Sequence, residues 1–100
     1  MENPHTIKIG ELVIVPETME VFVDGQPLSV TAGEFKLLHF LASHPGQAFT
    51  RQQIIEGVEG PNYPVTDRAV DVRIVGLRKR LGALGKWINA VRGVGYRFQN

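Results

Sequence analysis

The 100-residue sequence contains no cysteine, which excludes disulfide bonds, thiolate zinc sites and cysteine nucleophiles. Long hydrophobic runs are absent too, since none approaches the roughly 18 residues needed to span a bilayer. The acidic, proline-containing N-terminus lacks the basic and apolar regions of a signal peptide. These absences predict a cytoplasmic protein with no membrane segment.

Patterns typical of catalytic or metal sites are also missing. His5, His39 and His44 do not form metal-ligand spacing with carboxylates. The glycine-rich run at 93–95 is a poor nucleotide-binding candidate, because it leads into a predicted strand rather than a helix. We therefore expect no enzyme activity, no metal and no cofactor.

What the sequence does contain is enough apolar material for one core. Hydrophobic residues make up 43% of the chain, which is too many for disorder, while the length is too short for two domains. We expect a single domain over residues 1–100.

Charge is divided unevenly along the chain. Residues 1–66 hold three Lys/Arg against eight Asp/Glu, a net of −5, and residues 67–100 hold eight against two, a net of +6. Such asymmetry in a small domain predicts one basic surface aimed at a polyanion. The plainer alternative is a solvated helix face.

The basic half begins with a predicted helix over residues 66–81, TDRAVDVRIVGLRKRL. At about 100° per residue, one narrow stripe is apolar and faces the core. Its members are Val70, Ile74, Leu77 and Leu81. Thr66 is the expected N-cap, and Val65 is expected to pack on Val70 as a hydrophobic staple.

The opposite face of this helix combines cations with small side chains. It carries Arg68, Val72, Val75, Gly76 and Lys79, with Arg73 and Arg78 on the flanks. Cations suit phosphates, and short side chains let the backbone come close to base edges. The pattern favours a helix that enters a DNA groove.

The other elements predict an α+β domain. Four short strands are expected around Ile7 and Ile9, at 12–15, at 19–23 and at 28–30, with a hairpin turn at Asp24-Gly25. Capping boxes predict a helix from Thr31 and another from Thr50. After glycines at 82 and 85, two strands within 88–98 form a hairpin around an Arg-Gly-Val-Gly turn.

Six segments in this order closely resemble the effector domain of OmpR/PhoB-type response regulators. They are GEFKLL (33–38), PG (45–46), TR (50–51), DRAVDVRI (67–74), LRKRL (77–81) and VRGVGYRF (91–98). The resemblance implies a winged helix-turn-helix. That fold has an N-terminal four-stranded antiparallel sheet, three helices and a C-terminal hairpin wing paired with another short strand.

The resemblance also implies sequence-specific binding of double-stranded DNA for transcription regulation, with the helix at 66–81 in the major groove and the wing at 88–98 in the minor groove. Arg68, Arg73 and Arg78 correspond to phosphate contacts, Val72 to a contact with a thymine methyl and Arg92 to the minor-groove reader. The remaining implied contact positions are Ala69, Val75, Gly76, Ala90 and Tyr96.

Some of these positions depart from the family pattern. Family members often carry polar or basic side chains at 69, 75 and 76, threonine in place of Ala90, and tryptophan in place of Glu59. Gly76 costs a helix up to about 1 kcal/mol relative to alanine. Its presence indicates either a lost base contact or an unusually close approach to DNA.

The partners that the resemblance implies are a tandem dimer on directly repeated half-sites, an upstream receiver domain outside this chain, and RNA polymerase at the loop 59–65. For that loop a plain surface role is an equal alternative. No aspartate here corresponds to the phosphoacceptor. The alternative to DNA binding is a winged helix that serves as a protein-interaction module.

Overall fold

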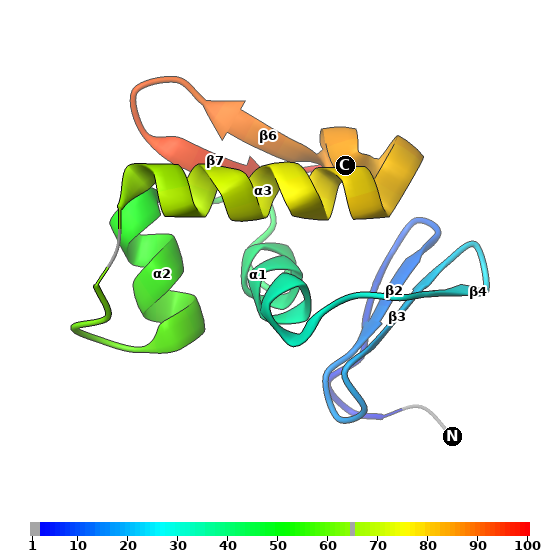
Figure 1. The fold of residues 1–100 in the computed structure, drawn as a ribbon. Helices are drawn as coiled ribbons and strands as arrows, with labels where there is room; N and C mark the ends of the chain where they lie inside the picture. Colours follow the sequence, from blue (N-terminus) through cyan, green and yellow to red (C-terminus); the bar gives the residue numbers. More distant parts are fainter. Residues whose placement is uncertain (1–2, 65) are drawn as a thin grey trace.

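The computed structural model describes residues 3–64 and 66–100 and contains a sheet, three helices and a second, smaller sheet (Figure 1). In chain order the elements are β1 (Ile7–Ile9), β2 (Leu12–Val15), β3 (Glu20–Val23), β4 (Gln26–Leu28), α1 (Ala32–Ala42), β5 (Phe49–Thr50), α2 (Arg51–Glu59), α3 (Asp67–Leu81), the 3₁₀ helix η1 (Gly82–Trp87), β6 (Ile88–Val91) and β7 (Gly95–Phe98). The predicted α+β class and element order are confirmed.

The N-terminal sheet is antiparallel with strand order β1-β2-β3-β4. Asp24 and Gly25 both have positive φ, 52° and 78°, which is what a two-residue hairpin turn of this type requires. Val23 therefore pairs directly with Gln26. The predicted position of the fourth strand, 28–30, was wrong, because this tight turn starts β4 at Gln26.

The first two helices begin at the predicted caps. The side chains of Thr31 and Thr50 each accept a hydrogen bond from the backbone N–H of the residue three positions on, and the side chains of Glu34 and Gln53 accept from the backbone N–H of Thr31 and Thr50. α1 is buried on more than one side, since Leu37 is only 2% exposed although it lies off the face that Phe35, Leu38 and Leu41 share.

The third helix has the predicted cap and the predicted buried stripe. Ala69 N donates to Thr66 Oγ1 at 3.1 Å, and the stripe residues are at most 5% exposed. The predicted staple from Val65 lies outside the described residues. At Gly82, where φ is +61°, α3 ends and the chain continues as η1 rather than as a loop.

The C-terminal hairpin forms the wing. β6 and β7 are antiparallel, and β7 also pairs with β5, so that Phe49 lies opposite Tyr96 and Thr50 opposite Gly95. A side chain at Gly95 would overlap the Phe49 carbonyl oxygen. β5 ties the wing to the start of α2 at this close approach.

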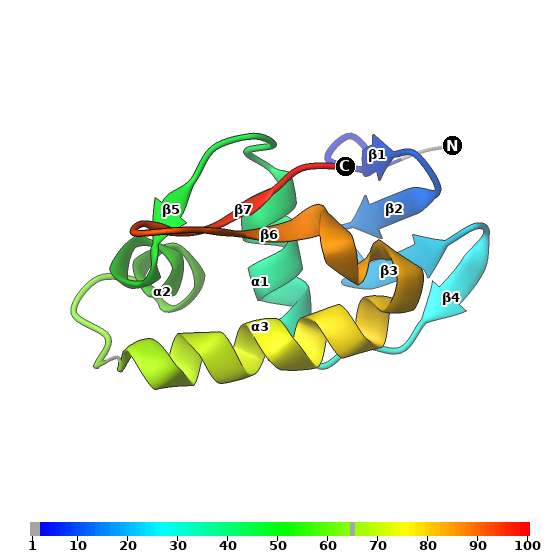
Figure 2. The same cartoon turned by 90° about the horizontal axis from the view of Figure 1, so that it is seen from above.

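One hydrophobic core joins these elements. It includes Leu12 and Ile14 of the sheet, Leu38 and Leu41 of α1 and Phe98 of the wing. The sheet lies near the C-terminal end of α3, whereas the turn of the wing lies at the other end near α2 (Figures 1 and 2). Within the described residues, no helix is long and apolar enough to cross a membrane.

Candidate nucleic-acid interface

The face of α3 opposite the core is exposed, as the sequence predicts. Arg68 and Ala69 are exposed in the first turn. Val72 and Val75 follow at the centre of the helix and are 60% and 48% exposed. The surface is therefore apolar along its middle and basic at its margin.

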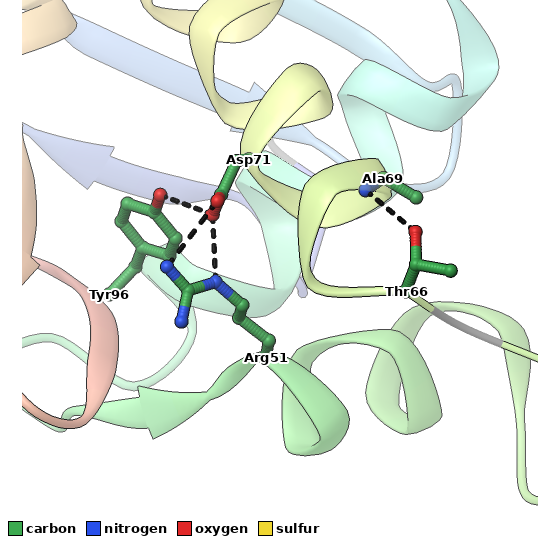
Figure 3. Close-up of polar contacts among 5 residues, drawn as sticks. All are labelled: Arg51, Thr66, Ala69, Asp71 and Tyr96. Carbon is green, nitrogen blue, oxygen red and sulfur yellow. Dashed lines mark hydrogen bonds and ion pairs between the residues drawn. The ribbon is translucent and has the colours of Figure 1, made fainter.

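A hydrogen-bonded cluster joins this helix to α2 and the wing (Figure 3). Arg51 Nε donates to Asp71 Oδ1 at 2.8 Å, and Tyr96 Oη donates to the same oxygen at 2.7 Å. The bond from Arg51, and then that from Tyr96, lowers the pKa of Asp71 below its usual value. Asp71 thus fixes the angle between the helix and the wing.

Arg78 makes a second link between α3 and the wing. Its Nε and Nη2 donate to the Ile88 carbonyl oxygen at 3.0 and 2.7 Å, and its guanidinium lies 5.6 Å from the centre of the Tyr96 ring. Arg78 is one of the predicted phosphate contacts, and two of its nitrogens are therefore already engaged within the fold. These bonds hold the guanidinium in place and so position its remaining donors.

Two further cations of the helix are ion-paired. Arg73 Nη1 lies 3.2 Å from Glu59 Oε1 at the end of α2, and Arg80 Nε lies 3.2 Å from Glu34 Oε1 in α1. Burial alone would raise the pKa of Glu34, but hydrogen bonds from Thr31 and Arg80 lower it. A phosphate at Arg73 would share that guanidinium with Glu59.

The turn of the wing carries a free cation. Arg92 is exposed and makes no ion pair within residues 3–64 and 66–100. Gly93 follows it with φ +79°, a conformation that favours glycine. A hollow of about 300 Å³ lies beside it, and its lining includes Arg51, Ala90 and Tyr96. Arg92 is thus free to meet an external anion.

Gly76 is half-buried rather than fully outward. A Cβ built at this position would meet Glu34 Oε2 at 3.8 Å, an ordinary van der Waals distance, and nothing closer. Packing within the domain therefore does not require glycine, and both explanations from the sequence stay open.

Sequence reasoning missed the Arg51–Asp71–Tyr96 cluster. The signal available was Asp71 itself, the one acid beyond the first turn of a basic helix. What the sequence could not supply is its partner, because Arg51 and Tyr96 come from elements 20 and 25 residues away.

We expect Asp71→Asn to lower the melting temperature at neutral pH, with a difference from wild type that narrows in acid. The folded-state pKa of Asp71 is lowered, so its contribution is present above the unfolded pKa of about 4 and is lost as pH falls through the folded value. Melting temperatures from pH 7 to pH 3 measure this. Asp24→Asn, in an exposed turn away from the cluster, is the control, and a constant difference for Asp71→Asn across the range would contradict the assignment.

A three-helix bundle with an N-terminal antiparallel sheet and a C-terminal hairpin beside the third helix is a winged helix-turn-helix, a class of DNA-binding domain. The model of the family "Transcriptional regulatory protein, C terminal" matches residues 25–98. The chain belongs to this family, and it is a DNA-binding output domain of the OmpR/PhoB type, not an enzyme.

Known relatives agree with this assignment. The phosphate regulon transcriptional regulatory protein PhoB of Escherichia coli is 42% identical over 98% of this chain. The RstA DNA-binding domain of Klebsiella pneumoniae, solved in complex with the RstA box, superposes with a TM-score of 0.83 at 36% identity, covering 94% of this chain and 96% of that one. The DNA-binding domain of CpxR from E. coli gives 0.82 at 36% identity, covering 95% and 96%. The chain spans only 44% of the length of PhoB.

Proposed function

We propose that this domain binds double-stranded DNA sequence-specifically, with α3 in the major groove and the β6–β7 wing in the adjacent minor groove. The observation that carries the proposal is the exposed face of α3, small and apolar at its centre and basic at its margin, beside a wing that presents Arg92, which has no ion-pair partner in the part of the chain that the structure describes. Phosphate contacts fix the register of such a domain, and base contacts specify the sequence.

The exposed and part-exposed residues of the predicted set take roles that their positions support. Arg68, Arg73 and Arg78 bind phosphates, the last two after partial engagement with Glu59 and Ile88. Val72 meets a thymine methyl, and Arg92 enters the minor groove. The rest of the interface consists of the exposed Ala69, Val75 and Ala90 and the half-buried Gly76, whereas Tyr96 is 8% exposed and supports the wing through its bond to Asp71.

The salt dependence of binding to duplex DNA tests the proposal. Three phosphate contacts should give a slope of log K against log salt of about −2.7, at about −0.9 for each phosphate neutralised. Affinity should then fall about 40-fold between 50 and 200 mM salt. Fluorescence anisotropy with a labelled duplex measures this over a series of salt concentrations.

Matched variants sharpen the test. Arg68→Ala should make the slope shallower by about 0.9, since it removes one phosphate contact. Arg80→Ala should leave the slope unchanged, because Arg80 is ion-paired to Glu34 of α1. Binding that is indifferent to salt would refute the proposal and favour the protein-interaction module instead.

We further propose that the loop 59–65 contacts RNA polymerase when the regulator is bound to DNA. Tyr63 near the middle of this loop is 41% exposed, and it follows a turn in which Asn62 has φ +65°. Glu59 is engaged by Arg73 of α3, so DNA bound at Arg73 would act directly on this loop.

The arrangement in the full-length protein is also proposed from its relatives. PhoB is more than twice as long as this chain, which accommodates an upstream receiver domain. We propose that two copies bind side by side on directly repeated half-sites, and that the protein acts in the cytoplasm as a transcription regulator. Binding-site selection on the isolated domain would give half-site sequence, spacing and orientation together.

A further inference from the structure

α3 exposes a continuous apolar ridge, which we define as Ala69, Val72 and Val75. Successive members are three positions apart and are therefore neighbours on the helix surface, in a row that winds about 60° around the axis at each step. All three are exposed, and Val72 and Val75, with Arg68 and Asp71, line a shallow hollow of about 290 Å³. Solubility does not favour two exposed valines at the centre of a helix, so their presence on the DNA-facing side requires another explanation.

The two side chains at the middle of this ridge, Val72 and Val75, carry no hydrogen-bond donor of their own. Gly76 beside Val75 has no side chain, and the Asp71 carboxylate already accepts from Arg51 and Tyr96. Arg73 on the flank is paired with Glu59. The centre of the helix therefore offers methyl groups to the floor of the groove.

Only one base presents a matching group in the major groove. Thymine carries a C5-methyl there beside its O4 acceptor, whereas guanine, adenine and cytosine present only acceptors or donors, which an apolar side chain would leave unpaired at a cost. The side-chain chemistry of the ridge thus selects thymine by contact and disfavours the other bases by desolvation.

The spacing of the ridge fits more than one base. Residues three apart on a helix have Cβ atoms about 5–6 Å apart, and stacked bases on one strand rise about 3.4 Å. Val72 and Val75 together therefore span one or two base steps. Both are β-branched and stiff at χ1, so holding them against a methyl costs little side-chain freedom.

We propose that Val75 adds a second apolar contact to that of Val72, so that the two side chains together read the C5-methyl groups of two thymines, one or two steps apart, at the centre of each half-site. The inference rests on the proposed function and extends it, because the second valine and the absence of a donor at 75 and 76 are features of this chain. Specificity at the centre of the half-site then comes from methyl contacts instead of hydrogen bonds.

Replacing thymine by uracil tests this directly. A duplex is first selected from random sequence, and each thymine of its half-site is then changed in turn to deoxyuridine, which keeps every donor and acceptor and loses only the methyl. Affinity should fall about fourfold at each of the two thymines, the effect of one buried CH₂-sized group, and should be unchanged at the others.

Variants assign each thymine to its valine. Val72→Ala and Val75→Ala should each reduce the uracil penalty to less than twofold at one of the two positions and leave it at the other. Both valines are exposed, so the variants fold. Val94→Ala in the wing is the matched control, since it removes an exposed valine that is 42% accessible from the side that faces the minor groove, where thymine shows no methyl.

The outcomes separate this inference from the proposed function. Salt-dependent binding with equal affinity for every uracil duplex, or a selected half-site without thymine at its centre, would overturn the valine pair and leave DNA binding intact. Failure to select any duplex, together with salt-independent binding, would refute both.

Discussion

Replacing Gly95 with alanine is expected to destabilise the domain by about 3 kcal/mol, near the upper end of the usual cost of overpacking. The added Cβ would overlap the Phe49 carbonyl oxygen and lie 3.1 Å from Thr50 Cα. Both neighbours are backbone atoms of β5, so no side chain can rotate away. The overlap can be relieved only if β5 and β7 separate, and this separation breaks the pairing that holds the wing to α2.

Gly76→Ala is the matched control for this substitution. It adds the same methyl group at a site where the nearest atom, Glu34 Oε2, is 3.8 Å away. Because alanine is the better helix former, we expect a gain of up to about 1 kcal/mol. Urea denaturation of both variants gives the two free energies of unfolding, and wild-type stability for Gly95→Ala would contradict the close approach of β7 to β5.

DNA affinity should fall together with the free energy of unfolding in Gly95→Ala, but the two quantities are not expected to change together in Gly76→Ala. At a temperature where Gly95→Ala remains folded, a wing no longer paired with β5 is free to move relative to α3, and affinity should fall. Gly76→Ala leaves the wing in place. If its affinity for the selected duplex falls while its stability rises, glycine at 76 is explained by close approach to DNA, and otherwise by a lost contact.

The helices could be predicted because their signals are local. Thr31, Thr50 and Thr66 each act as an N-cap within three residues of the group they bond, and the buried stripe of α3 follows from a single period. A motif order shared with a known family then supplied the arrangement of these elements, including the wing.

The parts that escaped prediction depend on distant pairing. β5 has two residues and exists only because β7 lies beside it, so the family resemblance implied a partner strand for the wing but no local signal placed it at Phe49–Thr50. The partners of Arg73 and Arg78 lie in α2 and at the start of β6, so the sequence could name these cations but not show how far each is already engaged. The position of β4 failed for a local reason, since Asp24 and Gly25 leave no room for a longer loop.

Arg92→Ala is expected to weaken binding at least tenfold when the minor groove beside the half-site is A·T-rich, the loss of about 1.5 to 3 kcal/mol that accompanies a hydrogen bond to a charged group. A narrow A·T minor groove concentrates negative potential and attracts an inserted arginine. Arg92 is exposed at the turn of the wing, and neither a carboxylate nor an internal acceptor holds it among the described residues.

The same variant should lose less on G·C-rich flanks, because the guanine amino group alters the groove edge and the groove is wider. Affinities of wild type and Arg92→Ala on duplexes that differ only in the flank give a double difference, and Arg80→Ala provides a cation variant with no flank dependence, since Arg80 is paired with Glu34. Arg92→Lys keeps the charge without the planar fork, so a large residual loss in that variant would show that guanidinium geometry matters. An equal loss on both flanks would instead make Arg92 a phosphate contact, and the wing would then hold the register of the domain without reading the groove.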